Sequence, residues 1–227
     1  MHLWDWIPKN GMLLTLIKKE FLLEFRQKSS LAAVLVYVVG TIFVSALCFK
    51  ARLDKPTWNA LFWVISLFTS VTICGKSFLR ESGGQALFNY LYYSPLHFIF
   101  SKILFNMSLM LALSLVTFFF YGFFIRNEVE NMGLFLLILC LASTGLGGVL
   151  SLMSAIASKA SASFGLMSIL SFPVLMPLIL VIIRLSKMAV DGVEWAGVSF
   201  QLIAILAALN LLTLALAFLL FPYLWRD

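Results

Sequence analysis

The stretch MGLFLLILCLASTGLGGVLSLMSAIA, from Met132 to Ala157, contains no charged residue and is long enough to cross a membrane as a helix. A spanning helix needs about 20 mostly apolar residues, whereas a strand of an outer-membrane barrel needs only about 10 residues of alternating polarity. Five further charge-free runs of similar length occur in the 227-residue chain. The sequence therefore predicts an all-α membrane protein with six transmembrane helices, at 31–49, 58–75, 103–125, 132–157, 164–183 and 198–221.

The composition agrees with this class. Hydrophobic residues make up 62% of the chain and charged residues 11%, against roughly 45–50% and about 25% in soluble proteins. The 16 basic and 10 acidic residues all lie outside the six runs and are too scattered for a nucleic-acid surface. An ion-coupled secondary transporter normally carries ionisable groups inside its spans, so that class is disfavoured.

Residues 1–30 precede the first run and form a separate N-terminal segment, followed by a six-helix domain at 31–227. Apolar residues at spacings of four predict an amphipathic helix that lies in the headgroup plane. A plain cytoplasmic extension of the first span is the alternative. The apolar positions are Leu13, Ile17, Phe21 and Phe25, and the basic ones opposite them are Lys18, Lys19, Arg26 and Lys28.

The distribution of basic residues predicts the orientation. With the N-terminus inside, ten Lys and Arg residues fall in cytoplasmic segments and six in outer segments. Basic residues are enriched in cytoplasmic loops, so both termini are predicted to be cytoplasmic.

The longest loop joins the second and third runs on the predicted cytoplasmic side. Aromatic and charged residues are interleaved there, and Gly83, Gly84 and Pro95 punctuate it. We expect short surface helices at about 76–82 and 85–93 that form either a docking surface or an interfacial loop. The outer loop from Arg184 to Gly197 is expected to be a solvated loop with Trp195 at the membrane interface, or a short re-entrant or interfacial helix.

Two spans have unusual composition. Pro173 and Pro177 each remove a backbone donor, so the fifth span is expected to bend, either as part of a transport pathway or as an ordinary kink. Small residues in the fourth span, including Gly145, Gly147 and Gly148, predict a tight helix interface within the chain or between two copies.

The sequence carries no recognisable catalytic apparatus. Its cysteines, Cys48, Cys74 and Cys140, are isolated within apolar runs, and no metal spacing or haem-attachment motif is present. We expect no enzyme activity, no resident cofactor and no metal, so any ATP hydrolysis must come from another chain.

Two stretches resemble the haem exporter B family (CcmB), the permease-like subunit of bacterial cytochrome c maturation. The first comprises Phe78, Arg80-Glu81, Leu91, Ser94-Pro95-Leu96 and Lys102, and the second Ser168-Ile169-Leu170, Pro173, Pro177 and Leu178. The number and spacing of the spans also agree. The family's usual Asp-Gly followed by Glu is replaced here by Gly83-Gly84-Gln85 and Asn89.

The resemblance implies an ABC-2-type permease-like fold in the bacterial inner membrane, with two copies of the chain bound to two copies of a CcmA-type ATPase. It also implies CcmC-type and CcmD-type membrane proteins, a CcmE-type haem chaperone and membrane lipid as partners. ATP would bind the ATPase subunit, and haem is the possible cargo.

The resemblance further implies that residues 76–102 are a coupling segment, with Arg80, Glu81, Leu91, Pro95 and Lys102 as its elements, and that Pro173 and Pro177 let the fifth span flex. Two activities stay open within the family: export of haem, or ATP-driven release of the haem-loaded chaperone. Outside it, the alternatives are an exporter permease for lipid or drug and a non-transporting scaffold.

Overall fold

The computed structural model describes residues 12–26, 28–50, 53–79, 95–159, 164–193 and 197–224. Within these ranges the chain is helical and contains no strand. The helices are α1 (Met12–Arg26), α2 (Lys28–Cys48), α3 (Lys55–Leu79), α5 (Pro95–Phe124), α6 (Met132–Lys159), α7 (Phe164–Val190) and α8 (Gly197–Leu224).

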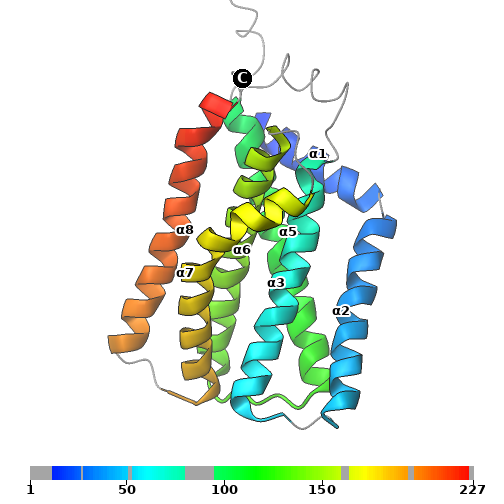
Figure 1. Cartoon of the computed structure of the whole chain (residues 1–227), viewed down its shortest axis with the longest axis vertical. Helices are drawn as coiled ribbons and strands as arrows, with labels where there is room; N and C mark the ends of the chain where they lie inside the picture. The colour runs from blue at the N-terminus through cyan, green and yellow to red at the C-terminus, as the bar shows by residue number, and fades with distance from the viewer. Residues whose placement is uncertain are drawn as a thin grey trace, which may run out of the picture.

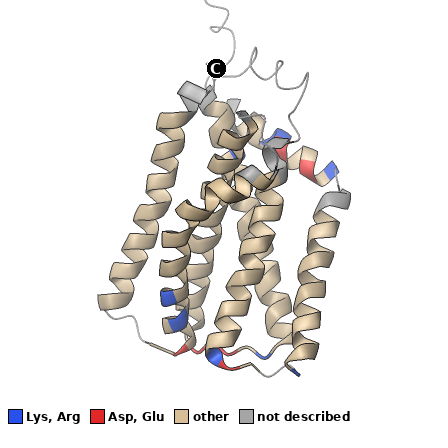
Figure 2. Cartoon of the chain, in the orientation of Figure 1, with Lys and Arg blue, Asp and Glu red and all other residues tan. Residues whose placement is uncertain are grey.

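Six of these helices are long and apolar enough to cross a membrane, which confirms the predicted fold class. They run side by side, and α1 lies across one end of the bundle (Figure 1). Charged residues gather near α1 and at the opposite end, and the described length between these ends carries few of them (Figure 2). We call these ends the α1 end and the loop end. The candidate spans are Leu31–Cys48, Lys55–Gly75, His97–Phe124, Met132–Ser158, Met167–Val190 and Gly197–Leu220.

Several helices extend beyond the charge-free runs, because a lone charged residue near a helix end does not break the helix. Its long side chain can reach the membrane surface while the backbone stays hydrogen-bonded. α7 continues through Arg184 and Lys187 to Val190, so the predicted loop from residue 184 is wrong in its first half. The last turn of α3 takes in 76–79, which corrects the predicted separate helix at 76–82.

The start of α5 needs the same correction. The helix begins at Pro95, a residue type favoured in a first turn because its missing N–H would have no helical partner there. Lys102 therefore lies inside a candidate span, and the expectation that every charged residue lies outside the spans is wrong at this position.

α6 is the central helix of the bundle and packs against α3, α5, α7 and α8. Gly147 makes the closest approach: a Cβ built there would lie 3.1 Å from Met107 Cα and 3.2 Å from Asn106 O, both in the backbone of α5. Van der Waals contact between closely spaced backbones drives helix association in lipid. Of the two interfaces left open for this small-residue stretch, Gly147 therefore serves the one within the chain.

α7 is a continuous helix that contains both prolines and bends along its length. Its yellow first part lies obliquely, whereas its gold second part runs along the bundle (Figure 1). Pro173 and Pro177 both lie on the exposed side of the helix. Each proline ring pushes against the carbonyl four residues earlier and opens the helix on its own side.

Candidate functional site

A buried ion pair joins α1 to α5 at the α1 end. Lys102 Nζ lies 3.4 Å from Glu20 Oε2, and the side chains are only 2% and 9% exposed. The same ammonium lies 5.5 Å from the centre of the Phe98 ring, one helical turn earlier in α5. An unpaired charge at this depth would cost several kcal/mol, about the penalty of removing an ion from water. The pair therefore offsets part of the cost of burying each charge.

Apolar contacts surround the pair. Leu16, one turn before Glu20, is buried, and the Phe21 ring meets the Phe105 ring edge-on with their centres 4.9 Å apart. The predicted apolar face of α1 is thus only partly the face that packs, because Phe25 is exposed and Glu20 is buried. Glu20 takes this position because Lys102 provides a partner for its carboxylate.

A second apolar stripe of α1 faces away from the bundle. Leu14, Leu22 and Phe25 are exposed, and Lys18 lies among them. A helix that lies in the headgroup plane has such a stripe toward the acyl chains, with long basic side chains that reach toward the phosphates. α1 thus has one face for α5 and one suited to lipid.

The residues assigned to the coupling segment are only partly placed. Arg80, Glu81 and Leu91 lie outside the described residues, and Pro95 is the first residue of α5. Lys102 is buried against α1, so it can act in coupling through Glu20 and α1 but not as an exposed contact.

Two asparagines hold spans together in the middle of the bundle. Asn106 Nδ2 of α5 donates to Ser151 Oγ of α6 at 2.8 Å, and Asn210 Nδ2 of α8 donates to Leu141 O of α6 at 2.9 Å. A Cβ on Gly145 would collide with Asn210 Oδ1. Sequence reasoning did not single out these asparagines, although an amide inside an otherwise apolar run is the signal that could have found them.

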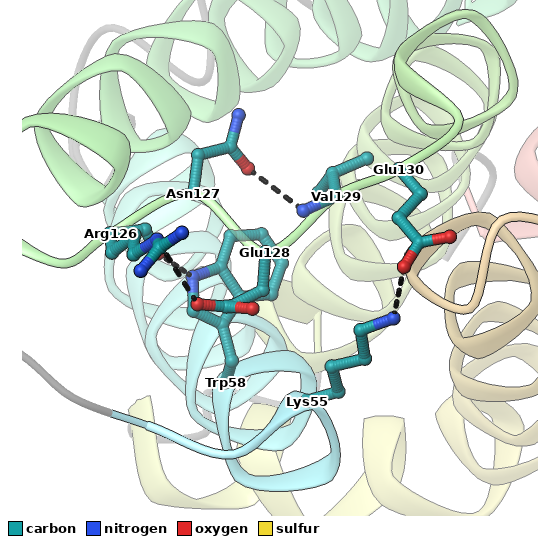
Figure 3. A network of polar contacts seen from close by, with 7 residues as sticks. All are labelled: Lys55, Trp58, Arg126, Asn127, Glu128, Val129 and Glu130. Carbon is teal, nitrogen blue, oxygen red and sulfur yellow. Dashed lines mark hydrogen bonds and ion pairs between the residues drawn. The ribbon is translucent and has the colours of Figure 1, made fainter.

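The loop end is closed by polar contacts between α3 and the loop that joins α5 to α6. Lys55 Nζ donates to Glu130 Oε1, and the Trp58 ring donates through Nε1 to Arg126 O at 3.0 Å (Figure 3). Arg126 Nε also lies 3.8 Å from Glu128 Oε1. Asp54 precedes α3, and hydrogen bonds from Thr57 lower the pKa of its carboxyl.

An aromatic cluster fills the bundle just inside this end. Its central member, Phe62, is fully buried, and five aromatic rings surround it at centre-to-centre distances of 5.2 to 6.0 Å. Tyr121 Oη donates to Trp58 O at 3.0 Å, which ties α5 to α3 at the same level. The surrounding rings are Trp58, Trp63, Phe118, Tyr121 and Phe135.

The arrangement resembles a membrane subunit more than a reaction centre. In the described part of the chain, no three or more His, Cys, Asp or Glu residues are grouped so as to hold a metal ion. At the α1 end, two buried charged residues of the described part of the chain, Glu20 and Lys102, form an ion pair between α1 and α5. This geometry holds α1 against the first turns of α5.

The family model described as CcmB protein matches residues 11–223, nearly the whole chain. The chain belongs to the CcmB family. CcmB proteins are multi-pass membrane subunits of cytochrome c biogenesis and haem transport, of the transporter-permease type, and are not catalytic enzymes. No curated protein and no solved structure matches the chain.

The CcmB match includes both partners of the buried ion pair. It begins one residue before α1 and ends within α8, so α1 belongs to the CcmB region together with the six spans. The α1–α5 junction is therefore a part of the CcmB domain and not an addition to it.

Proposed function

We propose that this chain is the transmembrane subunit of an ABC transporter complex for cytochrome c maturation in the bacterial inner membrane. It couples ATP hydrolysis by a separate CcmA-type subunit to haem export or to release of the haem-loaded CcmE-type chaperone. Two copies of the chain assemble with CcmC-type and CcmD-type membrane proteins. The observation that carries this proposal is the family match over residues 11–223.

The charges of α1 support an orientation with the α1 end in the cytoplasm, where the ATPase would bind. Lys18, Lys19 and Arg26 lie on this helix, and basic residues next to spans are enriched on the cytoplasmic side. α3 ends and α5 begins at this same end (Figure 1), and the stretch of sequence between them contains the proposed docking residues Arg80 and Glu81.

The packing at the loop end favours chaperone release over passage of haem through a single chain. The cluster around Phe62 fills the space between α3, α5 and α6, and haem moving through the middle of one chain would have to displace these rings. Haem export would instead follow the outside of the bundle or an interface between chains.

Deletion of the gene is expected to abolish c-type cytochromes selectively, because the maturation complex would lack its membrane subunit. A haem stain of membrane and periplasmic proteins measures this, with the restored gene and total membrane haem as controls. Unchanged c-type cytochromes in the deletion strain would reject the proposed function and leave an ATP-driven exporter of other cargo.

Replacing Arg80 and Glu81 together with alanine is expected to reduce the ATPase that co-purifies with the chain. These side chains would supply charged contacts at the rim of the docking surface, each worth about 1 kcal/mol or less when exposed. Two such losses weaken binding by up to about 2 kcal/mol, or up to about thirtyfold in Kd, and quantitative immunoblot of the purified complex measures the ATPase that is retained.

Arg126→Ala with Glu128→Ala is the matched control, because it removes the same two residue types at the opposite end. This control should leave the ATPase bound. The docking assignment fails if the Arg80 and Glu81 variant binds the ATPase and supports maturation as well as the unaltered chain does.

A further inference from the structure

The buried ion pair is an unusual way to attach α1 to a membrane helix. Glu20 and Lys102 are 82 positions apart in the sequence and become buried together only when α1 packs on α5. A buried ion pair contributes little net stability compared with apolar side chains of the same size, because both charges lose their hydration. The best-attested role of such a pair is to select one packing register of two helices over the other registers that apolar contacts would allow.

Apolar contacts alone do not determine which face of α1 packs on α5. Both the face around Leu16 and the stripe formed by Leu14, Leu22 and Phe25 are apolar, so hydrophobic attraction alone would let the helix roll on α5. Only one rotation brings the Glu20 carboxylate to Lys102. The ion pair therefore fixes which face of α1 packs on α5 and at what height.

Lys102 lies close to the start of α5, so the ion pair attaches α1 to the part of α5 nearest the proposed docking segment. Lys102 is seven residues after the first residue of α5, which is about two helical turns. The chain enters α5 directly from residues 80–94, the proposed docking segment. A displacement of residues 80–94 by the ATPase would therefore move the first turns of α5, to which α1 is attached, before the rest of that helix.

We propose that Glu20 and Lys102 are positioning residues that join α1 and the first turns of α5 into one body, so that ATP-driven movement of the coupling segment moves both helices together. This inference rests on the proposed function. It assigns α1 a role in transmission, in addition to its contact with lipid.

Removing the pair is expected to uncouple the complex. Glu20→Gln or Lys102→Met should lower c-type cytochrome formation by about two- to thirtyfold, the range expected for residues along a coupling path. The ATPase bound per chain should change much less, and cytochrome formation is compared per chain, because removing the partner of a buried charge can also lower the amount of chain. Glu20→Lys with Lys102→Glu should restore cytochromes, because the reversed pair can form in the same place. Lys187→Met makes the same chemical change as Lys102→Met at an exposed position at the loop end; it is the control and should have no effect.

A second variant keeps the test decisive if a single substitution prevents folding. Glu20→Leu with Lys102→Met leaves no unpaired charge, so this chain should accumulate normally. It should still form fewer c-type cytochromes, because nothing selects the rotation of α1. Full activity of this double variant would overturn the inference.

Cross-linking tests whether the two helices move together. Phe21→Cys and Phe105→Cys place thiols at a contact between α1 and α5, in a chain whose three natural cysteines are replaced with serine. A short bifunctional methanethiosulfonate reagent should join them without loss of ATP-dependent activity in membranes containing the assembled complex. Loss of activity on cross-linking, with recovery on reduction, would show that the helices move apart and would overturn the inference. If the unaltered chain fails to restore cytochromes, the proposed function itself is what fails.

Discussion

Replacing Gly147 with leucine is expected to lower the free energy of unfolding by about 3 kcal/mol, the upper end of the usual cost of overpacking. Even a single added carbon would lie 3.1 Å from Met107 Cα, and backbone atoms cannot turn aside as a flexible side chain can. α5 and α6 would have to separate along their closest contact. Titration of the purified protein in detergent micelles with sodium dodecyl sulfate measures the change.

Gly40→Leu is the matched control for this prediction. Gly40 is exposed on α2, and a Cβ there would have no atom within 4 Å. Leucine is the better helix former, so this variant should be unchanged or more stable by up to about 1 kcal/mol. Equal effects at the two glycines would refute the close packing of α5 on α6.

Phe62→Ala is expected to cost about 3–5 kcal/mol, as for other large side chains removed from a packed core. Five rings touch Phe62, and none can fill the cavity without losing contacts of its own. The same titration measures the effect, and near-ultraviolet circular dichroism should report the loss of aromatic order.

Phe119→Ala makes the same chemical change on the outside of the bundle, where the side chain is 68% exposed. It should shift the free energy of unfolding by no more than about 1 kcal/mol, because it leaves no cavity. If Phe62→Ala proved as mild as Phe119→Ala, the aromatic cluster would not be a structural core.

Much of the fold follows from the sequence, because long charge-free runs can only be membrane helices. The helix ends do not follow so directly. Charge-free runs mark where hydrocarbon begins, whereas a helix ends where its hydrogen bonding stops, and α7 therefore continues past Arg184. The same difference places Lys102 inside a candidate span although it lies outside the run.

The candidate site was harder to predict than the fold. Lys102 was singled out by resemblance, but its partner Glu20 was not, because periodicity on α1 cannot show which distant helix will provide a cation. The apolar pattern predicted that α1 is an amphipathic helix, but it did not predict which face of the helix packs on α5. The roles of Arg80, Glu81 and Leu91, and of the two prolines in flexing, stay predictions.

The bend in α7 has a consequence for how the spans could rearrange. Ile169 and Pro173 have carbonyls whose usual helical donors would be the nitrogens of Pro173 and Pro177, which carry no hydrogen. The prolines lie on the exposed side, so the helix is loosened on the side that the packed core does not use. We therefore expect that the angle between its two halves can change without breaking a backbone hydrogen bond at these two carbonyls. This arrangement predicts that α7 acts as a hinge that opens on its exposed side, away from the packed core.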